Sequence, residues 1–123
     1  MLNGQGIVKV DITQQKIVAL IDEGIVEYYY NMIPAHFIAR RSLYRPHITI
    51  VRTGKEKCDF NVAQKFEGRA VKFEYDGIIK FDTPYFYLEV WSEEISKIRQ
   101  ELGLPKFRNG FQCYHITVAN VKE

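Results

Sequence analysis

The sequence has few cysteines, no long apolar run and almost no net charge, and each of these shortages excludes a class of protein. Cys58 and Cys113 are far apart and form neither a CxxC redox motif nor a metal-ligand spacing. No apolar run is long enough to span a bilayer, and the start of the chain lacks the basic and then apolar order of a signal peptide. We therefore expect two reduced thiols in a cytoplasmic protein that does not enter a membrane.

Charge and composition indicate an ordinary globular chain. The 17 basic and 15 acidic residues give a net charge of +2, which is too even for a protein that holds duplex nucleic acid mainly by neutralising phosphates. With 46% apolar and 26% charged residues and no linker-like stretch, the 123 residues are expected to form a single domain over 1–123. Aromatic residues make up 14%, and they can pack in the core or stack on bases.

Hydrophobic periodicity and turn signals predict strands that alternate with helices. The expected strands cover residues 6–12, 16–21, 45–52, 70–75, 78–82, 85–91 and 113–121. Helices are expected after the N-cap residue Asp22, over about 61–66, and from the N-cap residue Ser92 to about residue 102. Asp76-Gly77 predicts a hairpin between the strands at 70–75 and 78–82. The order is similar in the two halves, and it predicts an α+β fold.

Two segments, PHITIV at 46–51 and YHITVA at 114–119, repeat a His-x-Thr pattern with aliphatic residues between. Because side chains alternate along a strand, His47 and Thr49 share one face, and the aliphatic residues take the other. His115 and Thr117 are related in the same way. A single copy would indicate only a strand with a hydrogen-bonded histidine. Two copies in matching frames make coincidence a poor explanation, and they predict a site.

These residue types suit the cleavage of a phosphodiester. Of two imidazoles with an ordinary pKa of about 6.5, one can accept a proton from the nucleophile while the other donates a proton to the leaving oxygen. The hydroxyls of Thr49 and Thr117 can bind the non-bridging oxygens. Which histidine is the base stays open. No carboxylate or thiol has metal-ligand spacing to His47 or His115, so no metal and no cofactor are expected.

The doubled motif resembles the 2H phosphoesterase superfamily, which is defined by two His-x-Ser/Thr-x motifs on symmetry-related strands and includes LigT-like RNA ligases and cyclic phosphodiesterases. The resemblance implies a bilobal LigT-like fold, in which two pseudo-symmetric βα lobes with antiparallel sheets, at about 1–55 and 56–123, surround a central cleft. It implies metal-independent hydrolysis of 2′,3′-cyclic phosphates, 2′–5′ or 3′–5′ oligonucleotides, or cyclic oligonucleotide signals. The compact chain and the spacing of its two motifs resemble a small phage-type branch called Swiss Army Knife, whose members counter cyclic-nucleotide immune signalling. The expected compartment is the cytoplasm, which is the host cytoplasm if the protein is phage-encoded.

Six further residues are candidates for substrate binding. Arg45 shares a face with His47 and could reach a phosphate, or could simply be a solvated strand end. On the strand 85–91, three aromatic residues oppose the core face and could stack on a base, namely Tyr85, Tyr87 and Trp91. The loop 106–110 offers Lys106 and Arg108, although most such loops are only solvated.

Two other functions stay open. One is a binding module that holds RNA or a cyclic nucleotide without turning it over, and the other is 2′–5′ ligation of RNA ends in the same site. Intact copies of both histidines and both threonines favour catalysis over binding alone. The expected partners are a nucleotide or a short or cyclic oligonucleotide, with no obligate protein partner.

Overall fold

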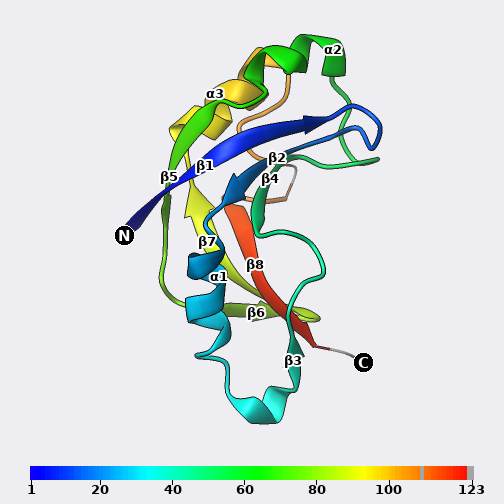
Figure 1. Cartoon of the computed structure of the whole chain (residues 1–123). Helices are drawn as coiled ribbons and strands as arrows, with labels where there is room; N and C mark the ends of the chain where they lie inside the picture. The colour runs from blue at the N-terminus through cyan, green and yellow to red at the C-terminus, as the bar shows by residue number, and fades with distance from the viewer. Residues whose placement is uncertain (109, 122–123) are drawn as a thin grey trace.

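The computed structural model describes residues 1–108 and 110–121, and in this part of the chain all strands belong to one antiparallel sheet (Figure 1). The strand order is β3-β8-β4-β2-β1-β5-β7-β6, and a further pairing of β8 with β7 closes the sheet. The closed ring β8-β4-β2-β1-β5-β7 is a six-stranded barrel, and β3 and β6 extend it. The elements are β1 (Leu2–Asp11), β2 (Lys16–Ile21), α1 (Glu23–Tyr30), η1 (Ala35–Phe37), β3 (Ala39–Arg40), β4 (His47–Val51), α2 (Phe60–Ala63), η2 (Gln64–Phe66), β5 (Ala70–Tyr75), β6 (Lys80–Asp82), β7 (Tyr85–Trp91), α3 (Glu93–Glu101) and β8 (Tyr114–Val121).

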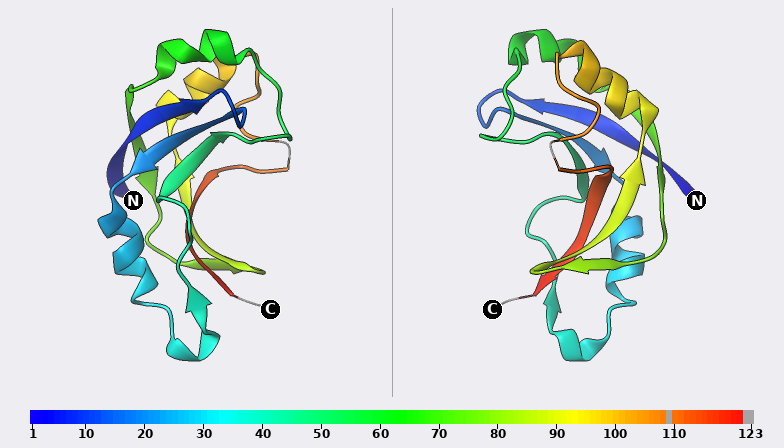
Figure 2. Two further views of the ribbon diagram at one scale, coloured as in Figure 1. Left: turned by 45° about the vertical axis from the view of Figure 1, so that its right-hand side comes forward. Right: turned by 180° about the vertical axis from the view of Figure 1, so that it is seen from behind.

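The expectation of an α+β fold with two βα lobes, at about 1–55 and 56–123, around a central cleft is wrong. Strand β1 pairs with β2 on one side and with β5 on the other, so the two expected lobes share one sheet. Strand β4 pairs with β8, which joins the two His-x-Thr segments directly. The three α-helices described are short and lie outside the barrel, α2 and α3 at one end and α1 beside the other (Figure 2). The molecule is therefore mostly sheet, closed on itself.

The barrel interior follows from alternation along the strands. Ile48 and Ile50 of β4 and Ile116 and Val118 of β8 are almost fully buried, as the periodicity predicts. They join aliphatic residues of the other barrel strands in one core cluster. Closure lets six short strands bury one face each without leaving a long open edge. The opposite faces of the same strands point out of the barrel and carry the polar residues.

The predicted hairpin at Asp76-Gly77 is also wrong. Strand β5 does not pair with β6; it pairs with β1 and with the end of β7, and the hairpin joins β6 to β7 instead. The Asp76 carboxylate accepts a hydrogen bond from the Ile78 backbone N–H, and the Asp76 N–H donates to the carbonyl of Glu89. These bonds direct the chain onward beside β7 rather than back along β5.

Helices α1 and α3 begin at the N-cap residues that the sequence predicts, Asp22 and Ser92. The side chain of Asp22 accepts a hydrogen bond from Gly24 N at 2.7 Å, and that of Ser92 accepts one from Ile95 N at 3.1 Å. Helix α1 packs against β8, and α3 packs against β5 and β4. None of the helices in the described ranges combines the length and apolarity needed to cross a bilayer.

A buried arginine ties α3 to the segment that follows β4. Arg99 is 1% exposed, and its guanidinium binds both carboxylate oxygens of Glu56, at 2.8 and 2.6 Å. It also donates to the carbonyls of Ile50 and Pro105, at 2.7 and 2.9 Å. The periodicity of α3 predicts its apolar stripe but not this buried charge. Through Ile50, Arg99 holds the strand that carries the first His-x-Thr segment.

Candidate active site

The two His-x-Thr segments lie side by side on neighbouring antiparallel strands. Ile48 of β4 is paired with Ile116 of β8, and both side chains are fully buried. Continuing this register by one residue each way sets His47 opposite Thr117 and Thr49 opposite His115. Because the isoleucines point into the barrel, all four polar side chains belong to its outer face.

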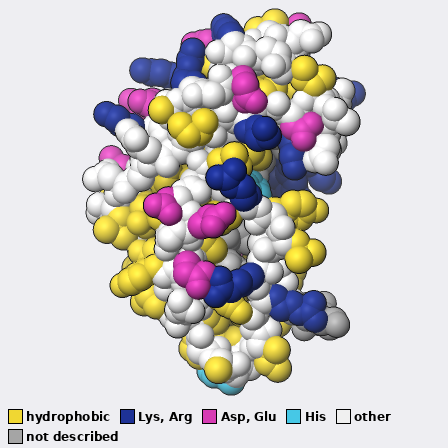
Figure 3. Space-filling view, viewed as in Figure 1, with side chains coloured by type: hydrophobic (Ala, Val, Ile, Leu, Met, Phe, Trp, Pro, Cys, Tyr) yellow, Lys and Arg dark blue, Asp and Glu magenta, His cyan; other side chains and the backbone are white. Residues whose placement is uncertain are grey.

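The register also sets the spacing of the site. Side chains directly opposite each other on paired strands have Cβ atoms about 4.5–5.5 Å apart, and diagonal neighbours are about 7–8 Å apart. His47 and His115 are diagonal neighbours of this kind, and each has a threonine opposite it. The four groups thus lie within about 8 Å of one another on one face of the sheet, as groups that contact the same phosphate must. On the face seen in Figure 3, a histidine lies in a hollow bordered by Lys and Arg side chains.

His47 begins β4 and is held through one ring nitrogen. Its Nδ1 lies 2.7 Å from the carbonyl oxygen of Arg45. Because a carbonyl only accepts hydrogen bonds, Nδ1 is the protonated nitrogen and Nε2 is the atom that can exchange a proton. The side chain is half-buried. The bond to Arg45 therefore fixes both the orientation and the tautomer of this ring.

Two aromatic rings contact the imidazole of His115. The Tyr87 ring meets it edge to face at 4.7 Å between centroids, and the Phe111 ring does so at 5.3 Å. Burial lowers the pKa of His115 below its ordinary value, and the nearby Arg108 cation lowers it further, against an opposing effect of Glu89. His115 is therefore mainly neutral at neutral pH.

Cys113 adjoins His115 but is not a nucleophile in this state. Its Sγ lies 3.7 Å from His115 Nε2 and 3.7 Å from a carboxylate oxygen of Glu89. Burial, together with the charge of Glu89, raises the pKa of the thiol to about 11. The thiol is thus protonated at neutral pH, and it fills the space between His115 and Glu89.

Three of the six predicted substrate-binding residues lie at this site. Tyr87 is paired with Thr117 on the neighbouring strand and contacts His115. The Arg108 guanidinium lies 4.1 Å from the centroid of the Phe111 ring, which in turn contacts His115. Arg45 precedes β4 in a loop, rather than in the strand as expected, and lines the same pockets as His47.

The other three are not brought to the site. Tyr85 and Trp91 are at opposite ends of β7, paired with Asn120 of β8 and Glu74 of β5 respectively. Lys106 Nζ lies 5.3 Å from the centroid of Phe107, whose ring packs on Tyr114 rather than on His115. Asn109, part of the predicted nucleotide-gripping loop, lies outside the described residues.

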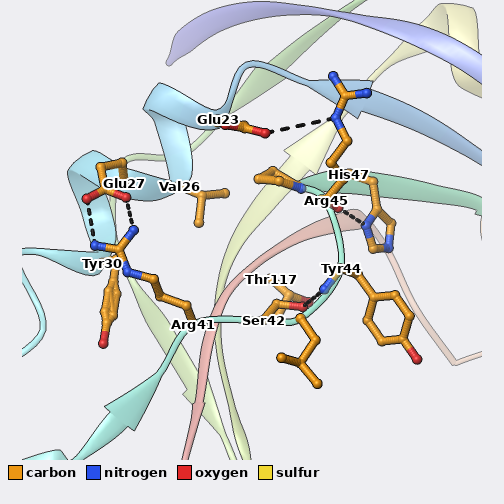
Figure 4. Close-up of a pocket in the computed structure, with 12 residues that line it drawn as sticks. Glu23, Val26, Glu27, Tyr30, Arg41, Ser42, Tyr44, Arg45, His47 and Thr117 are labelled. Carbon is orange, nitrogen blue, oxygen red and sulfur yellow. Dashed lines mark hydrogen bonds and ion pairs between the residues drawn. The ribbon is translucent and has the colours of Figure 1, made fainter.

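Two pockets meet at His47, and the segment Tyr44–Arg45 stands between them. The first, of about 320 Å³, is called the α1 groove and is lined by Glu23, Val26, Glu27, Tyr30, residues 41–46, His47 and Thr117 (Figure 4). The second, of about 400 Å³, is called the β1–β2 groove and is lined by Lys9, Asp11, Lys16, Val18, Leu20, Tyr44, Arg45 and His47. Both are at the lower end of the size range for small-molecule pockets.

Sequence reasoning missed Tyr44 and Phe111. Each is an aromatic residue in the loop just before a His-x-Thr segment, and each lies close to an arginine in the chain, Arg45 or Arg108. An aromatic residue and an arginine thus precede both motifs in the sequence, and this repeated pattern could have identified Tyr44 and Phe111 as candidate site residues. Strand parity could not supply it, because neither residue is in a strand.

No group of three or more His, Cys, Asp or Glu side chains within residues 1–108 and 110–121 is arranged to hold a metal ion. Comparison with known proteins adds no relative: no family model, no curated protein and no solved structure matches the chain. The assignment of a function therefore depends on the geometry of the site.

Proposed function

We propose that the protein is a phosphodiesterase that acts on nucleotide phosphodiesters by two-histidine general acid–base catalysis, as its motif resemblance to 2H phosphoesterases implies. The observation that carries the proposal is the pairing of Ile48 with Ile116. It supports a single site in which His47, Thr49, His115 and Thr117 share one outer face.

The reaction follows from these four groups. A neutral histidine takes the proton of the nucleophile, a water or a ribose hydroxyl, as its oxygen bonds to phosphorus. The bond from phosphorus to the leaving oxygen breaks, and the other histidine, protonated, gives its proton to that oxygen. The threonine hydroxyls donate hydrogen bonds to the non-bridging oxygens, which gain charge in the transition state. Proton exchange with water then returns both histidines to their starting states.

The environments of the rings favour one assignment of roles. The lowered pKa of His115, due mainly to burial, favours the neutral imidazole that a base requires. His47 exposes Nε2 while Nδ1 is bound to the Arg45 carbonyl, which suits an acid that donates from one defined atom. We therefore assign His115 as the base and His47 as the acid for cleavage.

The proposal is tested by product analysis with a nucleotide panel in the presence of EDTA, comparing the wild type with His115→Ala. The panel holds 2′,3′-cyclic mononucleotides, 2′–5′ and 3′–5′ oligonucleotides, and cyclic di- and trinucleotides. Multiple turnovers of at least one member, lost in the variant, are expected. Tight stoichiometric binding without turnover would instead identify a binding module, and joining of RNA ends would identify a ligase.

Removing the threonine hydroxyl at the site should slow turnover more than it weakens binding. For Thr49→Val we expect kcat to fall on the order of 100-fold with a much smaller change in KM, because the hydroxyl acts mainly in the transition state. Steady-state kinetics measure both constants. Thr53→Val, at an exposed position beyond β4, is the matched control. Equal effects of Thr49→Val on kcat and KM would contradict a transition-state role.

The acid limb of the pH profile should depend on Glu89. Because the charge of Glu89 raises the pKa of His115 against burial, Glu89→Gln should lower that pKa further. If neutral His115 is the base, the acid limb of kcat/KM then moves to lower pH. Glu74→Gln, at an exposed position on β5, should leave the limb in place. A limb that moves to higher pH in Glu89→Gln would overturn the assignment of the base.

A cytoplasmic location is part of the same proposal. Cys58 and Cys113 are both free thiols, as expected in a reducing compartment. In a phage-encoded protein this compartment would be the host cytoplasm.

A further inference from the structure

The two grooves beside His47 differ in charge. In the α1 groove the cations are matched, because Arg41 forms a two-pronged ion pair with Glu27 and Arg45 lies 4.0 Å from Glu23 (Figure 4). The β1–β2 groove has two lysines, Lys9 and Lys16, against one acid, Asp11, and it shares Arg45 with the α1 groove. An excess of positive charge in a groove attracts an anionic group.

The acid of the β1–β2 groove, Asp11, is the cross-strand partner of Lys16 but forms no ion pair with either lysine of the groove. The Asp11 carboxylate accepts a hydrogen bond from Gln14 N at 2.9 Å, within the turn after β1. The Lys16 ammonium instead lies 5.7 Å from the centroid of the Tyr44 ring, and Lys9 has Val18 as its cross-strand partner. No ion pair in the described part of the chain involves either lysine. Both ammonium groups are therefore available to a ligand.

The β1–β2 groove is continuous with the proposed catalytic site. His47 lines it, and on the sheet His47 is paired with Leu20 of β2, which also lines it. Lys9 is on β1, two strands across the sheet from His47 and two residues further along it, which is roughly 12 Å between backbones. A ligand with one phosphate between His47 and His115 would reach the two lysines with the next group along its chain. Tyr44, at the edge of the groove, offers an aromatic surface to a base.

We infer that the β1–β2 groove is an anion subsite for a second phosphate, next to the phosphate that is cleaved. This inference rests on the proposed function and narrows it. The preferred substrates are then oligonucleotides or cyclic oligonucleotides, which carry a second phosphate. A 2′,3′-cyclic mononucleotide would leave the subsite empty.

Binding of matched dinucleotides tests the subsite. The probes are ApA without a terminal phosphate, pApA and ApAp, each in 2′–5′ and 3′–5′ form, titrated calorimetrically into the His115→Ala protein so that turnover does not interfere. We expect at least one terminally phosphorylated form to bind on the order of tenfold more tightly than the matching ApA. Adding Lys9→Gln and Lys16→Gln should abolish this preference and should weaken the binding of ApA far less than that of the phosphorylated form. Lys97→Gln, at an exposed position on α3, should leave the preference intact.

The outcomes separate the subsite from the catalytic proposal. Equal affinity for the phosphorylated and unphosphorylated forms, a preference that survives both lysine substitutions, or no binding of any probe would overturn the subsite. Cleavage of ApA by the wild type in that case would leave the proposed function standing. A lysine-dependent preference without cleavage of any probe would support the subsite and contradict the catalytic proposal.

Discussion

Replacing either His47 or His115 by alanine is expected to lower kcat/KM at least on the order of 100-fold while the barrel stays folded. General acid and general base catalysis each contribute about 10²- to 10⁴-fold, and in this site each role has one histidine. Each ring is held on its own strand, His47 on β4 and His115 on β8, so neither ring can take the place of the other. Kinetics on the substrate identified with the nucleotide panel measure the loss.

The fold should survive because both histidines are on the outer face and only half-buried, while Ile48 and Ile116 fill the core behind them. Circular dichroism and thermal melting check this point for each variant. His36→Ala is the matched control, since that exposed ring contacts Phe37 and belongs to neither groove. Near-normal activity in either single variant at the site would contradict a two-histidine mechanism.

Replacing Arg99 by methionine is expected to destabilise the protein by roughly 3–5 kcal/mol. The substitution leaves the Glu56 carboxylate, which is 10% exposed, without its cation. It also removes the donors to the carbonyls of Ile50 and Pro105. For a domain of this size, Tm should fall by about 10 °C or more. Thermal or urea unfolding monitored by circular dichroism measures the change.

Two comparisons identify the cause of that loss. The double variant Arg99→Met with Glu56→Met should recover part of the stability, because it removes the unpaired charge as well. Lys65→Gln disrupts an exposed ion pair with Glu101 and should cost less than about 1 kcal/mol. An Arg99→Met protein as stable as the wild type would show that the buried pair does not hold α3 to β4.

The ion pair of Arg99 with Glu56 also predicts how the free energy of unfolding depends on pH in the acidic range. Burial alone would raise the pKa of Glu56, but its hydrogen bonds and charge interaction with Arg99 outweigh burial, and its pKa lies below the ordinary value. The contribution of ionised Glu56 to the free energy of unfolding is therefore complete above the ordinary pKa of a glutamate. It is lost as the pH falls through the lowered pKa that Glu56 has in the folded protein. Glu56→Gln should make the free energy of unfolding less dependent on pH in that acidic range.

Local features could be predicted from the sequence because local interactions determine them. The strands 70–75 and 85–91 occupy the expected residues, and Asp22 and Ser92 cap their helices. The alternation that sends Ile48 inward and His47 outward is likewise a property of the strand itself. These parts of the fold need no knowledge of which strands pair.

The pairing of strands could not be predicted in the same way. Periodicity does not encode which distant strand becomes a neighbour, so the closed barrel was missed and two separate lobes were expected. The buried position of Arg99 depends on Glu56 in another segment, and the apolar periodicity of α3 does not predict it. Tyr44 reaches the site from the loop between β3 and β4, where no periodicity of the sequence predicts the direction of a side chain.

The central claim, that His47 and His115 act on one phosphate, is tested most directly by nitrogen-15 NMR of the imidazoles. The wild-type protein is titrated with a dinucleotide phosphorothioate, a slowly cleaved analogue of the proposed substrates. We expect the ring signals of His47 and His115 to shift together with one dissociation constant, while His36, which belongs to neither groove, keeps its shift. Movement of only one of the two site histidines, or of neither, would contradict the account.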